Sequence, residues 1–144
     1  MNIQTLQHWL DEHIPACRLL GLQICQADLD KVVVSADFTP NHNHHNTIFG
    51  GSQSLLATAC AWLAVNINFP DAGGNIVIRQ SHIRYLAPAT GDVLAVCQVD
   101  GEQKRTCQQI LGKVNKGKIT VTCGIFCQDK QVAVFEGEFV VFRS

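Results

Sequence analysis

The sequence predicts an α+β fold in which one curved antiparallel β-sheet wraps around a long buried α-helix. Residues 52–68 form a helical segment that is apolar on nearly every side, and strand-like stretches precede and follow it. A helix without a polar face must be surrounded by other structure, and a single folded sheet provides that cover. We expect one domain over residues 1–144, because no repeat, linker or low-complexity tract interrupts the chain.

Composition excludes several classes of protein. The net charge of -1 leaves no basic surplus for nucleic-acid binding. The longest apolar stretch, Leu55 to Ile67, is too short to cross a bilayer, and the first residues lack the pattern of a signal peptide. The seven cysteines contain no C-x-x-C pair and are interpreted as reduced, mostly buried thiols. We therefore expect a cytoplasmic protein with no membrane partner, no structural metal and no cofactor.

Three elements are expected before the buried helix. Apolar residues at helical spacing predict an amphipathic helix over residues 2–13, which Pro15 stops. Two strands follow, Leu19 to Ala27 and Lys31 to Thr39, and the second alternates apolar and polar residues with the period of a half-buried strand. Residues 40–46 then form a polar loop that leads to the glycines before the helix.

Four strands are expected after the buried helix, joined by turns and one short helix or ordered loop. The strands are Ile76 to Leu86, Asp92 to Val99, Lys118 to Cys127 and Gln131 to Phe142. The helix or ordered loop covers residues 103–111. A sheet of this kind leaves an edge strand, and pairing with a second subunit is one natural remedy. A homodimer or a dimer of dimers is the expected assembly.

The junction before the helix, Phe49-Gly50-Gly51-Ser52, is the strongest candidate for chemistry. Glycines permit close approach of a ligand to the backbone. The first amides of a helix lack intrahelical acceptors and carry the positive end of the helix dipole, so they stabilise an oxygen that gains negative charge. The alternative is that Gly50 and Gly51 only turn the chain into the helix.

Two segments resemble the hotdog-fold thioesterases: residues 43–52, Asn-His-His-Asn-Thr-Ile-Phe-Gly-Gly-Ser, and residues 82–92, His-Ile-Arg-Tyr-Leu-Ala-Pro-Ala-Thr-Gly-Asp. The chain is most similar to thioesterase-like domains of the YiiD C-terminal type, which occur alone or behind an acetyltransferase domain. The matching features are Pro40-Asn41-x-Asn43, Thr47-x-Phe49-x-Gly51-Ser52, the helix with Trp62, residues 82–88, and Phe135-x-Gly137.

The resemblance implies hydrolysis of an acyl-CoA or acyl-carrier-protein thioester, with the carbonyl polarised by the Gly51 amide. It assigns Asn43, Gly51 and Thr58 to catalysis, and His82 is added as a catalytic candidate because an imidazole can act as a base. The candidate substrate-binding residues are Phe49, Gly50, Ser52, Arg84 and Tyr85. Related enzymes carry a His where this chain has Phe49, and a carboxylate where it has Thr58. The catalytic base is therefore not identified by the resemblance.

Other polar residues leave alternatives open. His44, His45 and His82 are candidate bases because imidazole titrates near neutrality. The histidines of the 42–45 loop are equally read as solvated loop residues, and His82 as a residue that makes a strand hydrogen bond. No carboxylate or cysteine stands near the loop to complete a metal site. Arg79 and Arg84 are candidates for the phosphates of coenzyme A or for ion pairs with carboxylates.

Two other functions fit the same residues. The missing carboxylate at Thr58 favours a non-catalytic module that binds acyl thioesters, such as a sensor or a partner of an acetyltransferase. A hotdog acyltransferase or dehydratase is the third possibility, although dehydratases use a His and a carboxylate that the sequence does not supply.

Overall fold

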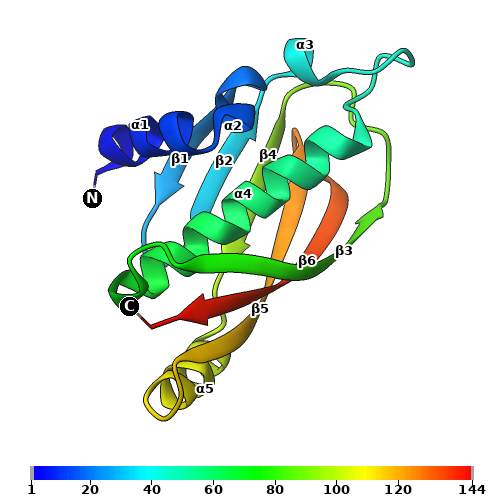
Figure 1. Cartoon of the computed structure of the whole chain (residues 1–144). Helices are drawn as coiled ribbons and strands as arrows, with labels where there is room; N and C mark the ends of the chain where they lie inside the picture. The colour runs from blue at the N-terminus through cyan, green and yellow to red at the C-terminus, as the bar shows by residue number, and fades with distance from the viewer. Residues whose placement is uncertain (1, 144) are drawn as a thin grey trace.

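The central helix α4, Gly50–Asn68, lies along the concave face of a six-stranded antiparallel sheet (Figure 1). The computed structural model describes residues 2–143. The strand order is β1-β2-β4-β5-β6-β3. The strands are β1 (Leu22–Ala27), β2 (Val32–Ala36), β3 (Ile76–Tyr85), β4 (Val93–Gln98), β5 (Lys116–Cys127) and β6 (Lys130–Phe142). The expected curved sheet around a buried helix is confirmed.

Small side chains on α4 allow the sheet to approach it closely. The thiol of Cys60 donates to the carbonyl oxygens of Val32 and Ala95, at 3.4 and 3.5 Å, and so bridges two strands. From the sheet side, the thiol of Cys123 donates to the carbonyl of Ala57 on α4 at 3.7 Å. Hydrogen bonding with neighbouring thiols and burial raise the pKa of Cys123 well above its ordinary value. These cysteines act as small packing residues, as the sequence predicts.

The first helix ends before Pro15 as predicted, but the segment from Pro15 to β1 differs from the prediction. Helix α1, Ile3–His13, is capped by Asn2, whose side-chain oxygen accepts from the Thr5 amide at 2.8 Å. Pro15 then begins a second short helix, α2 (Pro15–Leu19), because proline fits the first position of a helix, where its missing N–H is not needed. Gly21 turns the chain with a φ of 71°, and β1 therefore begins at Leu22 instead of Leu19.

The second predicted strand also ends early. β2 stops at Ala36, and residues 38–41 form a single helical turn, α3 (Phe38–Asn41). The carboxylate of Asp92 accepts from the Phe38 amide at 2.7 Å and holds the start of this turn. Because Asp92 lies 54 positions away in sequence, the local pattern does not reveal this contact.

Two further helical segments follow α4. The 3-10 turn η1, Pro70–Ala72, leads into β3, and helix α5, Gly101–Leu111, connects β4 to β5. α5 packs beside the part of β5 that extends past β4, and the Gln103 side-chain oxygen accepts from the Thr120 amide at 3.0 Å. The predicted helix or ordered loop over 103–111 is thus a helix that covers a strand edge. No helix within residues 2–143 has the length and apolarity needed to cross a membrane.

Strand β3 forms one edge of the sheet, since it pairs with β6 and with no second strand among the described residues. Ile78 lies opposite the buried Phe139 of β6, so its side chain points toward the α4 side of the sheet. Even so, Ile78 is 37% exposed, and Tyr85 on the same face is 50% exposed. The apolar face of β3 is therefore only partly covered by α4.

Candidate functional site

The start of α4 presents two backbone amides without partners. Phe49 is the N-cap, and its carbonyl accepts from the amides of Ser52 and Gln53 at 3.0 and 3.2 Å. The amides of Gly50 and Gly51 come before these, and neither has an acceptor among residues 2–143. They stand at the positive end of a 19-residue helix. This is the geometry that stabilises a carbonyl oxygen as negative charge develops on it.

A side chain at either glycine would crowd a neighbouring aromatic ring. A Cβ at Gly51 would lie 2.6 Å from Cε2 of the Phe49 ring, which folds back over the helix start. A Cβ at Gly50 would lie 3.2 Å from the hydroxyl oxygen of Tyr85. The Tyr85 hydroxyl donates to the Gly50 carbonyl at 2.9 Å, and burial raises the pKa of this phenol. Tyr85 is therefore a neutral hydrogen-bond donor at neutral pH, and it ties β3 to the first turn of α4.

A cleft of about 410 Å³ opens beside this junction. Its walls come from the loop before α4, the first turn of α4, and the end of β3 with the segment that follows it. The lining residues are Thr47, Ile48, Gly50, Gln53, Tyr85, Leu86, Ala87 and Pro88. The two segments that carry the sequence resemblance, 43–52 and 82–92, thus meet at one cleft. Of the predicted site residues, Gly50 and Tyr85 line it directly.

Asn43 organises the loop that leads to the helix. Its side-chain oxygen accepts from the His45 amide at 2.9 Å, and from both the amide and the hydroxyl of Thr47 at 3.2 Å. A backbone bond from the Asn43 amide to the Thr47 carbonyl, 2.8 Å, closes the loop. The oxygen of Asn43 is thus committed to the loop. Its side-chain NH₂ has no partner among the described residues and is the group left to meet a ligand.

Thr58 lies on the same face of α4 as Gly51, because seven residues make nearly two complete turns. The separation along the helix axis is about 10 Å at the usual rise per residue. Its hydroxyl donates to the Ser54 carbonyl at 2.7 Å. Leu55 and Thr58 are each only half-buried, so this part of α4 is not fully covered by the sheet. Ser52, by contrast, is 7% exposed and lies on the covered side.

His82 and Arg84 share one face of β3, as the alternation predicts. His82 lies opposite the exposed Glu136 of β6, and this register places it on the face of the sheet away from α4. The structure therefore does not bring His82 or Arg84 together with Gly51 within one chain. Arg79, at a bulge in β3, forms an ion pair with Glu138 at 2.6 Å.

The histidines of the 42–45 loop do not converge on one point. The ring of His42 stacks on Phe38 with 5.3 Å between ring centroids, and its Nδ1 lies 3.0 Å from the Asn43 carbonyl. His44 and His45 contact each other, with 4.1 Å between their ring centroids. Within residues 2–143 no group of three His, Cys, Asp or Glu side chains is arranged to hold a metal.

Gln53 is a site residue that the sequence analysis missed. It is 4% exposed and lines the cleft, and its side-chain NH₂ donates to the Ile48 carbonyl over a long 3.4 Å. The other end of the amide, Oε1, is buried and has no hydrogen-bond partner among the described residues. The signal in the sequence was a glutamine near the start of a mostly apolar helix.

Replacement of Gln53 by methionine is expected to stabilise the protein by about 1 kcal/mol, because it removes a buried acceptor that has no donor. The Ile48 carbonyl loses only a long bond. Urea unfolding followed by circular dichroism measures the change. Gln53→Glu, of the same size but charged, is the control and is expected to destabilise the fold. If Gln53→Met lowers the free energy of unfolding instead, Oε1 has a donor in solution.

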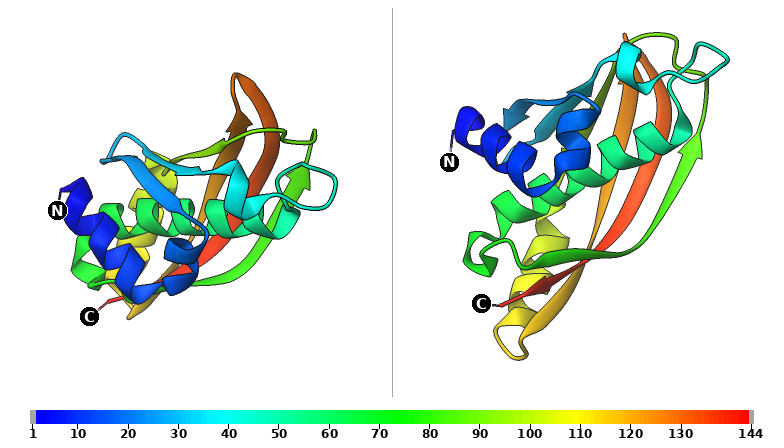
Figure 2. Two further views of the ribbon diagram at one scale, coloured as in Figure 1. Left: turned by 90° about the horizontal axis from the view of Figure 1, so that it is seen from above. Right: turned by 45° about the horizontal axis from the view of Figure 1, so that its top comes forward.

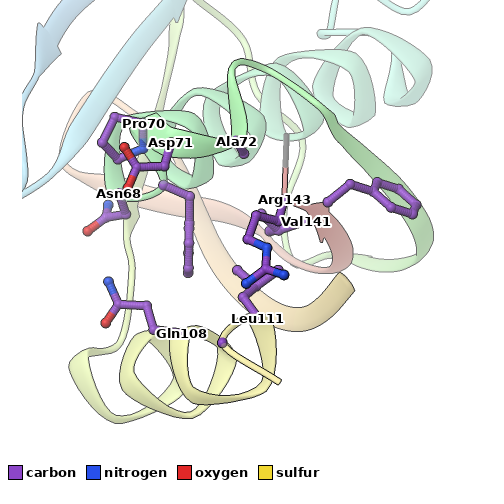
Figure 3. Close-up of a pocket in the computed structure, with 11 residues that line it drawn as sticks. Asn68, Pro70, Asp71, Ala72, Gln108, Leu111, Val141 and Arg143 are labelled. Atoms are coloured by element: carbon purple, nitrogen blue, oxygen red, sulfur yellow. The ribbon is translucent and has the colours of Figure 1, made fainter. Parts of the chain in front are cut away.

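A second cavity, of about 340 Å³, lies at the opposite end of α4 (Figure 3). Asn68, Pro70 and Asp71 contribute from the end of α4 and from η1, while side chains of α5 and of the end of β6 form the other walls. Arg143 donates to the Asn115 side-chain oxygen at 2.9 Å. This cavity contains none of the residues that the sequence assigns to the site.

Solved structures of similar fold cover nearly the whole chain. A protein of unknown function from Chlorobaculum tepidum is 24% identical with a TM-score of 0.89, over 98% of this chain and 94% of that one. The "putative thioesterase" from Shewanella oneidensis is 26% identical with a TM-score of 0.82, over 97% and 96% of the two chains. A thioesterase from Haemophilus influenzae is 16% identical with a TM-score of 0.78, over 99% and 92%.

The order of elements, the curved antiparallel sheet and the long helix match these neighbours, so the chain has the hotdog fold. The family model described as "Putative thioesterase (yiiD_Cterm)" matches residues 3–143, which is almost the full length. The motifs at both walls of the cleft and this match agree, and the chain belongs to the YiiD C-terminal family of thioesterases.

Proposed function

We propose that this protein hydrolyses acyl thioesters of coenzyme A or of an acyl carrier protein at the start of α4. The observation that carries the proposal is the unpaired Gly51 amide, at the positive end of a buried helix and beside an open cleft. The thioester carbonyl oxygen accepts from this amide, and the oxygen of a water molecule adds to the carbonyl carbon. The carbon–sulfur bond then breaks, the acid is released, and the thiol leaves with a proton from the water.

We assign the other predicted site residues roles that agree with where they lie. The side-chain NH₂ of Asn43 positions the water or the substrate, since its oxygen is held by the loop. Phe49, 56% exposed at the mouth of the helix start, lines the acyl path. Gly50 and Ser52 shape the first turn, and Tyr85 holds the cleft wall through its bond to the Gly50 carbonyl. Thr58 lies farther along the open face of α4.

We propose a homodimer, alone or as half of a dimer of dimers, in which β3 of one chain pairs with β3 of the other. The half-exposed apolar face of β3 and the uncovered face of α4 support this, because a second copy would cover both. His82 and Arg84 point away from their own helix start. The cytoplasmic location remains part of the proposal.

The direct test is a screen of purified protein against acyl-CoA thioesters from acetyl to palmitoyl, with detection of the released thiol. Hydrolysis of at least one chain length is the expected result. If correctly folded protein releases no thiol from any of them or from acyl carrier protein, hydrolysis is rejected.

A non-catalytic acyl-thioester binding module is the second candidate. It is favoured by Thr58, where related enzymes carry a carboxylate, and by the position of His82 on the far face of the sheet. In that case acyl-CoA raises the melting temperature of the protein but is recovered intact. A thermal-shift titration run beside the hydrolysis assay separates the two functions.

Asn43→Ala is expected to lower kcat/KM by about 100-fold, since it removes both the NH₂ and the oxygen that holds the loop. Asn43→Asp is the informative partner variant, because it keeps the acceptor and removes only the donor. Steady-state kinetics with the best acyl-CoA measures both. If Asn43→Asp retains full activity while Asn43→Ala does not, Asn43 acts through the loop alone and has no direct part in the reaction.

A further inference from the structure

Positive charge is concentrated in one short stretch of the chain. Between Gln103 and Lys118 there are five basic residues and no carboxylate: Lys104, Arg105, Lys113, Lys116 and Lys118. The net charge of the whole chain is -1, so with +5 in this stretch the remainder carries -6. The stretch is α5 and the first strand residues after it, which lie at the end of the molecule away from the start of α4 (Figures 1 and 2).

Part of this stretch forms a groove of about 410 Å³, here called the basic groove. Its cations are Arg79, Lys116 and Lys118, and its apolar lining is Ile110, Val114 and Val140. Ile110 is 41% exposed and Val114 is 53% exposed, so the groove offers apolar surface to a partner. Arg79 is partly neutralised by Glu138, whereas Lys116 and Lys118 have no carboxylate within 4 Å among residues 2–143.

We propose that the basic groove docks an acidic, amphipathic helix of an acyl carrier protein. The inference rests on the proposed function, because a carrier protein is of use only to a protein that handles its thioester. Aliphatic side chains in the middle with cations at the rim complement a helix that has an apolar stripe and flanking carboxylates. Opposite charges across such a surface steer encounter and select the partner.

The phosphates of coenzyme A fit the groove less well. The phosphates of coenzyme A are close together, beside one nucleoside. Proteins commonly bind the base of such a nucleoside by stacking an aromatic ring or a guanidinium on it. None of the described lining residues is aromatic, and the one guanidinium is engaged by Glu138. Lys116 and Lys118 lie along one strand and Arg79 on another, which suits charges spread along a helix.

In the proposed dimer, the basic groove lies nearer to the site of the partner subunit than to the site of its own chain. The 19 residues of α4 span about 28 Å, so α5 is far from its own Gly51. In the proposed dimer, antiparallel β3 strands place the Tyr85 end of one chain beside the Ile76 end of the other. Arg79 lies on β3 near the Ile76 end. The groove is on the outer face of the sheet, since Lys116 and Lys118 alternate with buried residues. Along the dimer seam, the groove of one chain is therefore nearer to the helix start of the other chain than to its own.

The test measures binding without turnover. Full-length protein is titrated with an acyl carrier protein that carries an octanoyl group through a non-hydrolysable thioether, and the affinity is read by calorimetry. Lys116→Glu/Lys118→Glu is expected to weaken binding at least tenfold. The matched control, Lys31→Glu/Lys130→Glu, makes the same change in net charge elsewhere and is expected to alter affinity less than twofold. Wild-type affinity is expected to fall as salt rises.

Circular dichroism and melting temperature confirm that both double variants are folded. The docking proposal is overturned if the carrier protein does not bind, if both double variants weaken binding equally, or if the groove variant loses affinity for octanoyl-CoA and not for the carrier. Hydrolysis of octanoyl-CoA, and of the octanoyl thioester of the carrier protein, is measured in parallel. Hydrolysis without carrier binding rejects the docking surface alone, whereas carrier binding without hydrolysis of either thioester rejects the hydrolase and keeps the docking surface.

Discussion

Gly51→Pro is expected to lower kcat/KM for acyl-thioester hydrolysis by about 10²–10³-fold, the usual effect of losing one oxyanion donor. Proline lacks the N–H that would hold the carbonyl oxygen. Gly51 is the second residue of α4, where an N–H has no intrahelical acceptor, so the helix itself tolerates proline. Steady-state kinetics with the best acyl-CoA gives the ratio, and circular dichroism checks the fold.

Gly51→Ala is the matched control, because it adds the same Cβ against the Phe49 ring but keeps the amide donor. Its loss of activity therefore measures the steric effect alone, and the difference between the two variants measures the donor. If Gly51→Pro and Gly51→Ala lose the same factor in kcat/KM, the Gly51 amide does not stabilise the transition state. The thioester carbonyl would then have to bind elsewhere.

Thr58→Asp is expected to raise kcat by about tenfold or more, within the range that a positioned base contributes. Thr58 shares the uncovered face of α4 with Gly51, and it stands where related enzymes carry a carboxylate. A carboxylate there can take the proton from the attacking water. The measurement is initial-rate hydrolysis of the same acyl-CoA, with pH varied to detect the ionisation of the new group.

Thr58→Asn is the control, since it is similar in size and polarity but cannot take up a proton near neutral pH. It is expected to leave kcat unchanged within a few-fold. If Thr58→Asp gives no increase while substrate still binds, the reacting carbonyl does not lie within reach of this face. The binding-module candidate gains weight in that case.

Much of the fold was predictable because it follows from patterns of apolar and polar residues within short stretches of the chain. The all-apolar segment of residues 52–68 predicts a surrounded helix, and the alternation in Lys31–Thr39 predicts a half-buried strand. Errors occurred where a distant contact or a special backbone position decided the outcome. The first helix ends before Pro15 as predicted, but Pro15 also starts a second helix that was not expected. Asp92 holds a helical turn at Phe38 where a strand was expected to continue.

For the candidate site too, some features were predictable from the sequence and others only from the structure. The sequence by itself determined that a glycine pair precedes a buried helix, because this is a matter of residue type and spacing. Its resemblance to the hotdog thioesterases added that Phe49 and Thr58 stand where related enzymes carry a His and a carboxylate. Only the tertiary structure decided that Tyr85 closes on the Gly50 carbonyl, that Gln53 is a buried acceptor, and that His82 faces away from Gly51. Strand register and helix–strand contacts join residues far apart in the chain, and no local pattern encodes them.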